Sequence, residues 1–293
     1  MIIDAHAHLN FNAYKNDLDE VVKRAFAENV WLINVGSKYE TSKKAVEIAE
    51  NYKEGVYASI GLHPIYSATE FVKIKTDPEE GDFKVGEESF DKEKYKELAK
   101  SEKVVAIGEI GLDYYYKPKT KNKLEKFKEK QREVFIKQLE LAKELNLPVI
   151  FHCRMAHNDL IEVLKSQIPM TNEQSNPKSQ IPIKGVIHCF TGSWEQAKEY
   201  LEMGFYLGFN GIIYKLDLDE VIKKTPLEKI LVETDCPYLT PPLPSEALAK
   251  EGRNEPIFIK YIIKRIAEIK NIDYQKVAEI TTSNARRLFK INP

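Results

Sequence analysis

The stretch IIDAHAHL, residues 2–9, opens the chain with an alternation of apolar and polar side chains. This period of two predicts a β-strand in which Asp4, His6 and His8 point to the same face. Two imidazoles at positions i and i+2 of a strand converge on a point just beyond it, which is a geometry that suits a metal ion. A pair of structural histidines is the alternative reading. The stretch alone does not separate the two, so the rest of the chain has to decide.

Eight apolar segments of strand length alternate with segments of helical spacing. The expected strands are residues 2–9, 30–36, 56–62, 104–110, 148–152, 185–190, 205–211 and 230–235, and two closing helices are expected at 256–270 and 274–289. Strands joined by helical crossovers form a parallel sheet. We therefore predict an α/β fold, a (β/α)8 TIM barrel, with residues 1–293 as a single domain. A doubly wound open sheet is the alternative, but no Gly-rich turn follows the first strand.

Composition limits the function classes. The 293 residues are 43% hydrophobic and carry a formal net charge of −1, which argues against a basic coat protein for nucleic acid. A nuclease stays possible, since a bound cation can neutralise phosphates locally. The first strand starts at residue 2 and leaves no room for a signal peptide, and no run has the length of a membrane span. We expect a cytoplasmic protein without a membrane partner, and a monomer, although the sequence does not set the oligomeric state.

The three cysteines are widely spaced, which is unlike a disulfide framework. Cys153, Cys189 and Cys236 each directly follow a candidate metal ligand. Because side chains alternate along a strand, each thiol should point away from the metal and into packing.

Five of the six histidines and two carboxylates fall in or just after predicted strands, near their carboxyl ends: His6, His8, His63, Glu109, His152, His188 and Asp235. Active sites of barrels lie at that end, and seven incidental hydrogen-bonding residues on six strands would be a poor explanation. Imidazole and carboxylate without thiolate suit Zn²⁺, Mn²⁺ or a similar hydrolytic cation. Glu109, in the middle of the ring, could bridge two cations, and two cations about 3.5–4 Å apart can activate a water.

Six motifs in fixed order give the chain a family resemblance. DAHAHL, GLHP, IGEIGLDYYY, VIFHCR, GVIHCFTGS and ETDCPYL followed by GRNEP closely resemble the TatD family of metal-dependent deoxyribonucleases, and SNARRLF extends the match to the chain end. The resemblance implies a barrel related to the amidohydrolases. It implies that one metal is held by His6, His8 and Asp235 and a second by His152 and His188, with Glu109 bridging them. His63 and Arg154 would then face the scissile phosphate or its neighbours.

The resemblance implies a deoxyribonuclease, a 3′–5′ exonuclease on single-stranded DNA or free 3′ ends. Two divalent ions (Zn²⁺, Mn²⁺ or Mg²⁺) and an activated water would act with the catalytic residues Asp235 and Glu109, and Asp235 would accept the proton of the water. The same constellation could hydrolyse an ester or amide, as a D-aminoacyl-tRNA deacylase does. A metal-holding scaffold without turnover is a third hypothesis, which the intact ligand set argues against.

Three further features leave alternatives open. Lysines at 117, 119, 121, 123, 126, 128 and 130 could attract a nucleic-acid backbone, but Glu125 and Glu129 dilute their charge and such a run is usually a solvated helix face. Tyr114–Tyr116 could offer a base-stacking platform or could pack on the barrel. Residues 66–90 and 167–184 look long for the family and could shape substrate access or be tolerated surface insertions. Met155 replaces an acidic residue common in the family, so a polar contact there is in doubt.

Overall fold

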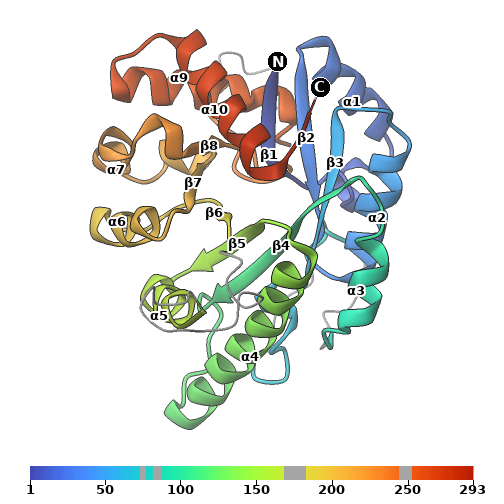
Figure 1. Cartoon of the computed structure of the whole chain (residues 1–293), viewed down its shortest axis with the longest axis vertical. Helices are drawn as coiled ribbons and strands as arrows, with labels where there is room; N and C mark the ends of the chain where they lie inside the picture. The colour runs from blue at the N-terminus through green and yellow to red at the C-terminus, as the bar shows by residue number, and fades with distance from the viewer. Residues whose placement is uncertain (73–76, 82–87, 168–182, 244–252, 293) are drawn as a thin grey trace, which may run out of the picture.

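The computed structural model describes residues 1–72, 77–81, 88–167, 183–243 and 253–292. Its eight strands form one parallel sheet in which each strand pairs with the next one along the chain, from β1 to β8 (Figure 1). The strands are β1 (Ile2–Ala7), β2 (Val30–Val35), β3 (Val56–Ile60), β4 (Val104–Asp113), β5 (Val149–Arg154), β6 (Gly185–Ile187), β7 (Tyr206–Phe209) and β8 (Ile230–Val232).

Helices follow the strands and cover the outside of the sheet (Figure 1). They are α1 (Leu18–Ala27), α2 (Tyr39–Glu50), α3 (Lys92–Leu98), α4 (Lys121–Leu145), α5 (His157–Gln167), α6 (Trp194–Glu202), α7 (Asp219–Lys224), α9 (Ile259–Lys270) and α10 (Tyr274–Phe289). The predicted (β/α)8 barrel is therefore confirmed. Among the described residues no helix is both long and apolar enough to cross a membrane.

Local sequence explains where several helices begin and end. Asp273 precedes α10 and its carboxylate accepts from the backbone N–H of Gln275 at 2.8 Å and of Lys276 at 3.2 Å. Ser193 and Gln196 form a reciprocal capping box at the start of α6. At the other end, α4 stops at Asn146, whose φ of 52° is left-handed and suits asparagine. These caps satisfy backbone groups that helix ends leave unpaired.

The barrel is nearly closed rather than fully hydrogen-bonded around its circumference. Across the junction between β1 and β8 there is one isolated bridge, Ala7 to Cys236, with two nearby backbone hydrogen bonds, from the N–H of His8 to Cys236 at 2.9 Å and from the N–H of Asp235 to His6 at 2.8 Å. The side chain of Asp4 adds further contacts. Asp4 accepts from the backbone N–H of Thr234 at 2.9 Å and from its hydroxyl at 2.5 Å. Asp4 therefore fastens the first strand to the last, which is a structural role.

Bulges on two strands change which way side chains point. Between Asp4 and Ala7, β1 has one residue more than its partner β2, and between Ile107 and Ile110, β4 has one more than β5. An extra residue reverses the alternation beyond it. On β1, Ile3 and Ala5 belong to one core cluster and Ala7 to the other, as this reversal requires. Asp4 consequently lies on the face opposite to His6 and His8, and the prediction of one shared face is wrong for Asp4.

The amino end of the barrel is closed by the last helix. Leu288 and Phe289 of α10, with Ile291, share a core cluster with Ile3 of β1 and Ile150 of β5. Both chain ends lie together here (Figure 1).

The buried amide of Asn284 donates to the backbone carbonyls of Leu227 and Ile230, both at 2.9 Å. The interior of the barrel is therefore covered at its amino end by α10.

The two segments expected to be long for the family fall partly outside the described residues: positions 73–76 and 82–87 of the segment 66–90, and positions 168–182 of the segment 167–184. Other strand ends differ from prediction. β4 continues to Asp113, whereas β1, β6 and β8 stop before His8, His188 and Asp235. A left-handed φ of 56° at Asp235 is incompatible with a continuing strand. Several candidate ligands therefore lie on the first residues of loops.

Candidate metal centre

His6 and His8 lie side by side at the carboxyl end of β1. Both are buried, and their Nε2 atoms are 3.0 Å apart. The Nδ1–H of His8 donates to the carbonyl of Val35 at 2.8 Å, because a carbonyl can only accept. That bond leaves the Nε2 of His8 with a free lone pair directed toward its neighbour. The two imidazoles therefore meet as metal ligands would.

Glu109 occupies the centre of the cluster. The bulge in β4 lies at this residue, and its carboxylate is buried. Its Oε2 lies 3.4 Å from Nε2 of His6, and its Oε1 lies 2.9 Å from Nε2 of His188. Oε1 is also in contact with Nδ1 of His152. The two oxygens thus face different sets of histidines, as a bridging carboxylate requires.

Asp235 approaches the same histidines from the last strand. Its Oδ1 lies 3.4 Å from Nε2 of His8 and 3.6 Å from Nε2 of His6. Its backbone N–H donates to the carbonyl of His6 at 2.8 Å, which fixes the loop across the β8–β1 junction. The side chain is 13% exposed, so it is open to a small solvent molecule while most of it is enclosed.

The donor atoms form overlapping groups of three. The four groups are His6, His8 and Glu109; His6, His188 and Asp235; Glu109, His152 and His188; and His63, Asp113 and His152, with the chosen ligand atoms within 4.8 Å of one another in each. Burying two carboxylates without positive charge is costly. Either protons on the histidines or cations must balance them. A set of imidazole and carboxylate groups without thiolate fits divalent hydrolytic cations.

Electrostatic coupling is visible in the pKa values. Burial opposes ionisation of Glu109, but neighbouring imidazoles, His188 and His152 among them, outweigh it and hold the pKa of Glu109 well below its usual range. Burial likewise opposes ionisation of Asp235, and the bond from His8 lowers its pKa nonetheless. In return Glu109 and Asp113 raise the pKa of His152 to about 9 against burial. The carboxylates are ionised and attract positive charge, which is what a cation site needs.

Two carboxylates that the sequence analysis did not assign hold the histidines from outside. Asp113 Oδ2 accepts from Nε2 of His152 at 3.0 Å, which turns Nδ1 of that ring toward Glu109. Glu233 is fully buried, with Oε1 3.3 Å from Nδ1 of His188. Carboxylates behind metal-binding histidines fix the tautomer and ring orientation. Asp113 could have been found by continuing the alternation of β4 past residue 110, since it shares parity with Glu109.

His63 and Arg154, the predicted substrate contacts, border the cluster. Nδ1 of His63 accepts from the backbone N–H of Ile65 at 3.1 Å, so its Nε2 faces Glu109 Oε1 at 3.5 Å. Burial and the neighbouring His152 lower the pKa of His63 to about 3, so the ring is neutral. Arg154 ends β5 and is exposed, with its guanidinium carbon 3.6 Å from the centre of the Tyr115 ring.

Of the remaining sequence candidates, some are buried in the packing of the barrel and others are exposed. The three cysteines are free; Cys153 lies 4.0 Å from the hydroxyl of Tyr200, and Cys236 is part of the core. His157, which the sequence left unassigned, is buried with Nδ1 3.1 Å from the same hydroxyl. Tyr114 is buried, whereas Tyr115 and its neighbour Tyr116 are both 48% exposed.

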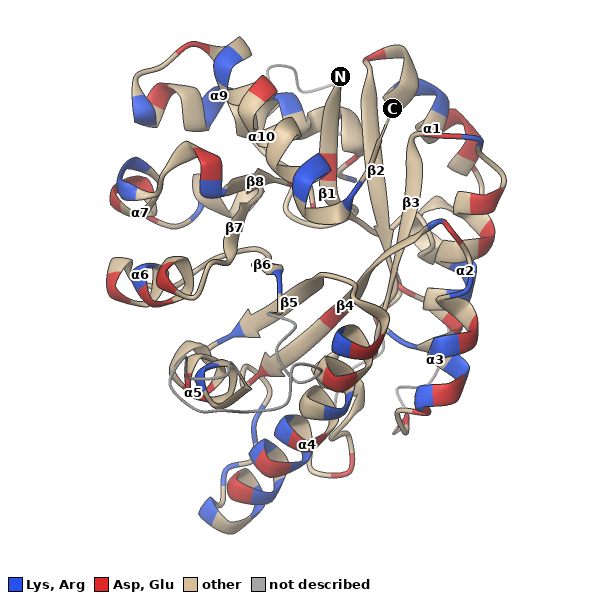
Figure 2. Cartoon of the chain, in the orientation of Figure 1, with Lys and Arg blue, Asp and Glu red and all other residues tan. Residues whose placement is uncertain are grey.

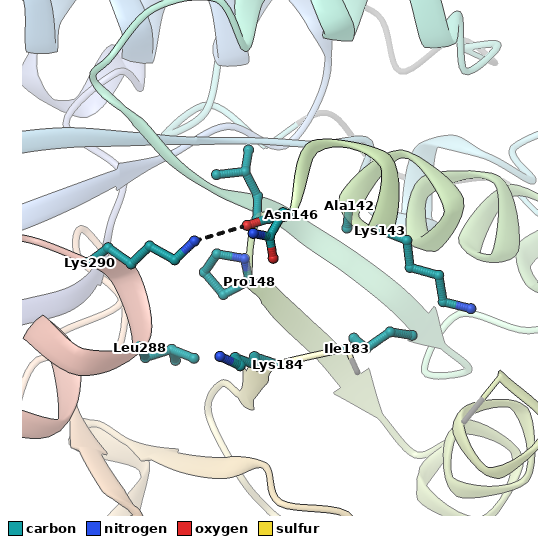
Figure 3. A pocket seen from close by; sticks show the side chains of 9 residues that line it. Ala142, Lys143, Asn146, Pro148, Ile183, Lys184, Leu288 and Lys290 are labelled. Atoms are coloured by element: carbon teal, nitrogen blue, oxygen red, sulfur yellow. Dashed lines mark hydrogen bonds between the residues drawn. The ribbon is translucent and has the colours of Figure 1, made fainter. Parts of the chain in front are cut away.

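A hollow at the opposite end of the barrel is not part of this centre. It is lined by the residues before β5 and β6 and by the end of α10, including Pro148, Lys184 and Lys290 (Figure 3). Nζ of Lys290 donates to the carbonyl of Asn146 at 3.4 Å across it. Its volume of about 20 Å³ holds no more than a water molecule.

A parallel α/β barrel with buried histidines and carboxylates at the carboxyl end of its strands defines a metal-dependent hydrolase. Residues 3–290 match the model of the TatD related DNases, and the chain belongs to this family. It is 40% identical over 297 residues to an uncharacterised metal-dependent hydrolase, YabD of Bacillus subtilis, covering 100% of both chains. It is 32% identical to the 3′-5′ ssDNA/RNA exonuclease TatD of Escherichia fergusonii, covering 99% of this chain and 100% of that one.

Solved structures agree with the fold. The crystal structure of YjjV, a TatD homologue from Escherichia coli K12, superposes with a TM-score of 0.76 at 26% identity, covering 99% of this chain and 98% of that one. The metal-dependent hydrolase class and the barrel are thereby established for this chain.

Proposed function

We propose that this enzyme hydrolyses phosphodiester bonds of single-stranded DNA from the 3′ end and that it does so with two divalent cations. The observation that carries the proposal is Glu109, whose Oε2 faces His6 while Oε1 faces His188. One carboxylate between two sets of imidazoles is the arrangement that two cations need. The exonuclease name of the relative from E. fergusonii supports the choice of substrate.

In this proposal His6, His8 and Asp235 hold one cation, His152 and His188 hold the other, and Glu109 holds both. Cations bound there supply Lewis acidity that activates water and offsets charge on the phosphate. Asp235, ionised and 13% exposed, accepts the proton of the attacking water. His63, neutral with its Nε2–H free to donate, and the cationic Arg154 hold the phosphate oxygens and orient the phosphorus for in-line attack.

The experiment uses purified protein stripped of metal and reloaded with Mn²⁺, Mg²⁺ or Zn²⁺. A DNA strand labelled at its 5′ end should give a ladder that shortens from the 3′ end, and the variant Glu109→Ala should give none. The same preparations are incubated with D-aminoacyl-tRNA. Release of amino acid without any cleavage of DNA would replace the nuclease by the ester hydrolase. A protein that binds metal but turns over neither substrate would favour the scaffold.

A further inference from the structure

The carboxyl end of the barrel is chemically asymmetric, and one side is aromatic and basic. Arg154, at the end of β5, lies flat against the ring of Tyr115, which follows the end of β4. The backbone N–H of Tyr115 donates at 2.8 Å to Asp113, the residue that holds His152. Tyr116 stands edge-on to Tyr115 with ring centres 4.8 Å apart. This group, which we term the aromatic rim, is therefore built directly onto the metal centre.

Positive charge continues outward from the aromatic rim. Residues 114–124 contain four lysines and no acidic residue: Lys117, Lys119, Lys121 and Lys123, all exposed. Figure 2 shows the blue positions along the loop into α4 and at the tip of β5. Exposed aromatic rings interleaved with cations are the surface that single-stranded nucleic acids bind, because every base has a face that can stack.

The opposite side carries negative charge. Residues 77–81, with the sequence DPEEG, are tied to the loops after four neighbouring strands, β8, β1, β2 and β3. Tyr238 donates to Asp77 at 2.6 Å, and Ser37 and Tyr66 both donate to Glu80. The backbone N–H of Ala13 donates to the carbonyl of Glu79 at 3.0 Å. We term this segment the acidic rim.

The acidic rim lies close to the candidate ligands. The ring of Tyr238, which holds Asp77, is centred 6.4 Å from that of His8. The carbonyl of Ser37, whose hydroxyl reaches Glu80, accepts from the backbone N–H of His63 at 2.7 Å. Lys38 lies over the ring of Tyr66 at 5.1 Å, so a cation is close to the acidic rim, which itself has three carboxylates in residues 77–80.

We propose that a polynucleotide crosses the site in one direction, over the aromatic rim, and that its end lies against the acidic rim. The inference rests on the proposed nuclease function and adds which residues select strand ends. On the aromatic rim a base stacks on the Tyr115–Arg154 pair while lysines accompany the following phosphates. On the acidic rim a continuing chain would bring further phosphates against Asp77 and Glu80. Like charges repel there, so an uninterrupted strand is excluded and a terminus is accepted.

The test compares a single-stranded circle, which is an uninterrupted strand, with a linear strand of the same sequence, which has an end. The wild-type enzyme, loaded with Mn²⁺, should cut the circle at less than about a tenth of the linear rate. Asp77→Asn combined with Glu80→Gln removes two charges and keeps the shape of both side chains. Each amide keeps one acceptor oxygen, and at Glu80 the NH2 group can donate to the second hydroxyl in place of the lost acceptor. It should raise the ratio of circle to linear cleavage about ten-fold or more.

Matched variants control for charge and folding. Glu97→Gln combined with Glu133→Gln removes two charges from the outer helices and should leave the ratio as in the wild type. Tyr115→Ala should raise KM for a linear oligonucleotide roughly 5- to 150-fold, as loss of one base stack predicts, with kcat retained. Tyr115→Phe keeps the stack and should resemble the wild type.

The outcomes distinguish this inference from the proposed function. Hydrolysis of bis(p-nitrophenyl) phosphate, which has no chain to accommodate, reports on the wild-type chemistry alone. If the wild type hydrolyses neither this ester nor linear DNA, the nuclease function fails and the inference falls with it. If it shortens linear DNA from the 3′ end but the double variant keeps the wild-type ratio of circle to linear cleavage, the inference alone is wrong. If it cuts circles as fast as linear strands, the inference and the choice of the 3′ end are both wrong, while phosphodiester hydrolysis stands. An unchanged KM in Tyr115→Ala would likewise refute the aromatic rim.

Discussion

Replacing Asp113 by asparagine tests whether a residue outside the ligand set controls metal binding. Asp113 uses two oxygens, Oδ1 for the backbone N–H of Tyr115 at 2.8 Å and Oδ2 for Nε2 of His152 at 3.0 Å. Asparagine has one acceptor oxygen, so the variant must either lose the Tyr115 bond or present an N–H to His152. In the second case the proton of the imidazole moves to Nδ1, the atom that faces Glu109.

The expected magnitude follows from the bond that is lost. A hydrogen bond to a charged group contributes about 1.5–3 kcal/mol, and loss of a carboxylate behind a metal-binding histidine weakens affinity about 10- to 100-fold. We expect Asp113→Asn to bind Mn²⁺ about 10- to 100-fold more weakly than the wild type. At saturating Mn²⁺ its rate should recover most of the wild-type value. Isothermal titration calorimetry of the stripped protein measures the Mn²⁺ affinity. The rate as a function of Mn²⁺ concentration measures the recovery of activity.

A matched control is Asp159→Asn. There a single oxygen, Oδ2, accepts from Tyr114 at 3.0 Å and from Lys128 at 2.9 Å, so one amide oxygen can replace it. Its Mn²⁺ affinity should stay within about two-fold of wild type, since surface substitutions of this kind cost little. If Asp113→Asn binds Mn²⁺ as tightly as this control, Asp113 does not orient His152 and the argument is refuted.

Further predictions concern the metals and the barrel. Protein reconstituted with metal should contain about two divalent ions per chain by elemental analysis, and a single ion at saturation would contradict the bridging role of Glu109. Glu109→Ala should bind metal poorly. His63→Ala should keep its metal and lose about 10²–10³-fold in rate, and excess metal should not restore that rate. Loss of metal from His63→Ala would mean that His63 is a metal ligand. Asn284→Ala should lower the free energy of unfolding by about 2–4 kcal/mol in urea titration, because two buried carbonyls lose their donor, while exposed Gln275→Ala should change it by less than about 0.5 kcal/mol.

The spacing of apolar residues along the sequence was sufficient to predict the barrel. Strands and helices repeat with different periods, and these periods are set by backbone geometry alone. Predicting the positions of the seven polar residues required only that parallel strands end at one edge. All seven lie at the carboxyl end of the barrel, with the described donor atoms in contact. Their assignment to two cations stays a prediction.

Local irregularities of the backbone explain what the sequence did not predict. No local pattern in IIDAHAHL predicts the extra residue in β1. Strict alternation therefore placed Asp4 on the same face as His6 and His8, which is wrong. The sequence does not predict the bulge at Glu109 either. Because the predicted strand ended at residue 110, Asp113 was not recognised as part of it. Residues 77–81 looked like a candidate surface insertion, since their ties to four distant loops depend on tertiary contacts that no local pattern encodes.

The junction between β1 and β8 links folding to the metal centre. His6 and His8 come from the first strand and Asp235 from the loop after the last, so this group exists only when the barrel closes. Yet closure there depends on one bridge, on the backbone bonds of His8 and Asp235 beside it and on the bonds of Asp4 to Thr234, not on a full ladder. A cation held by residues on both sides would add its binding free energy to this junction, where pairing between the strands is sparse. Metal binding at this position would therefore also stabilise the closed barrel, in addition to the bonds of Asp4.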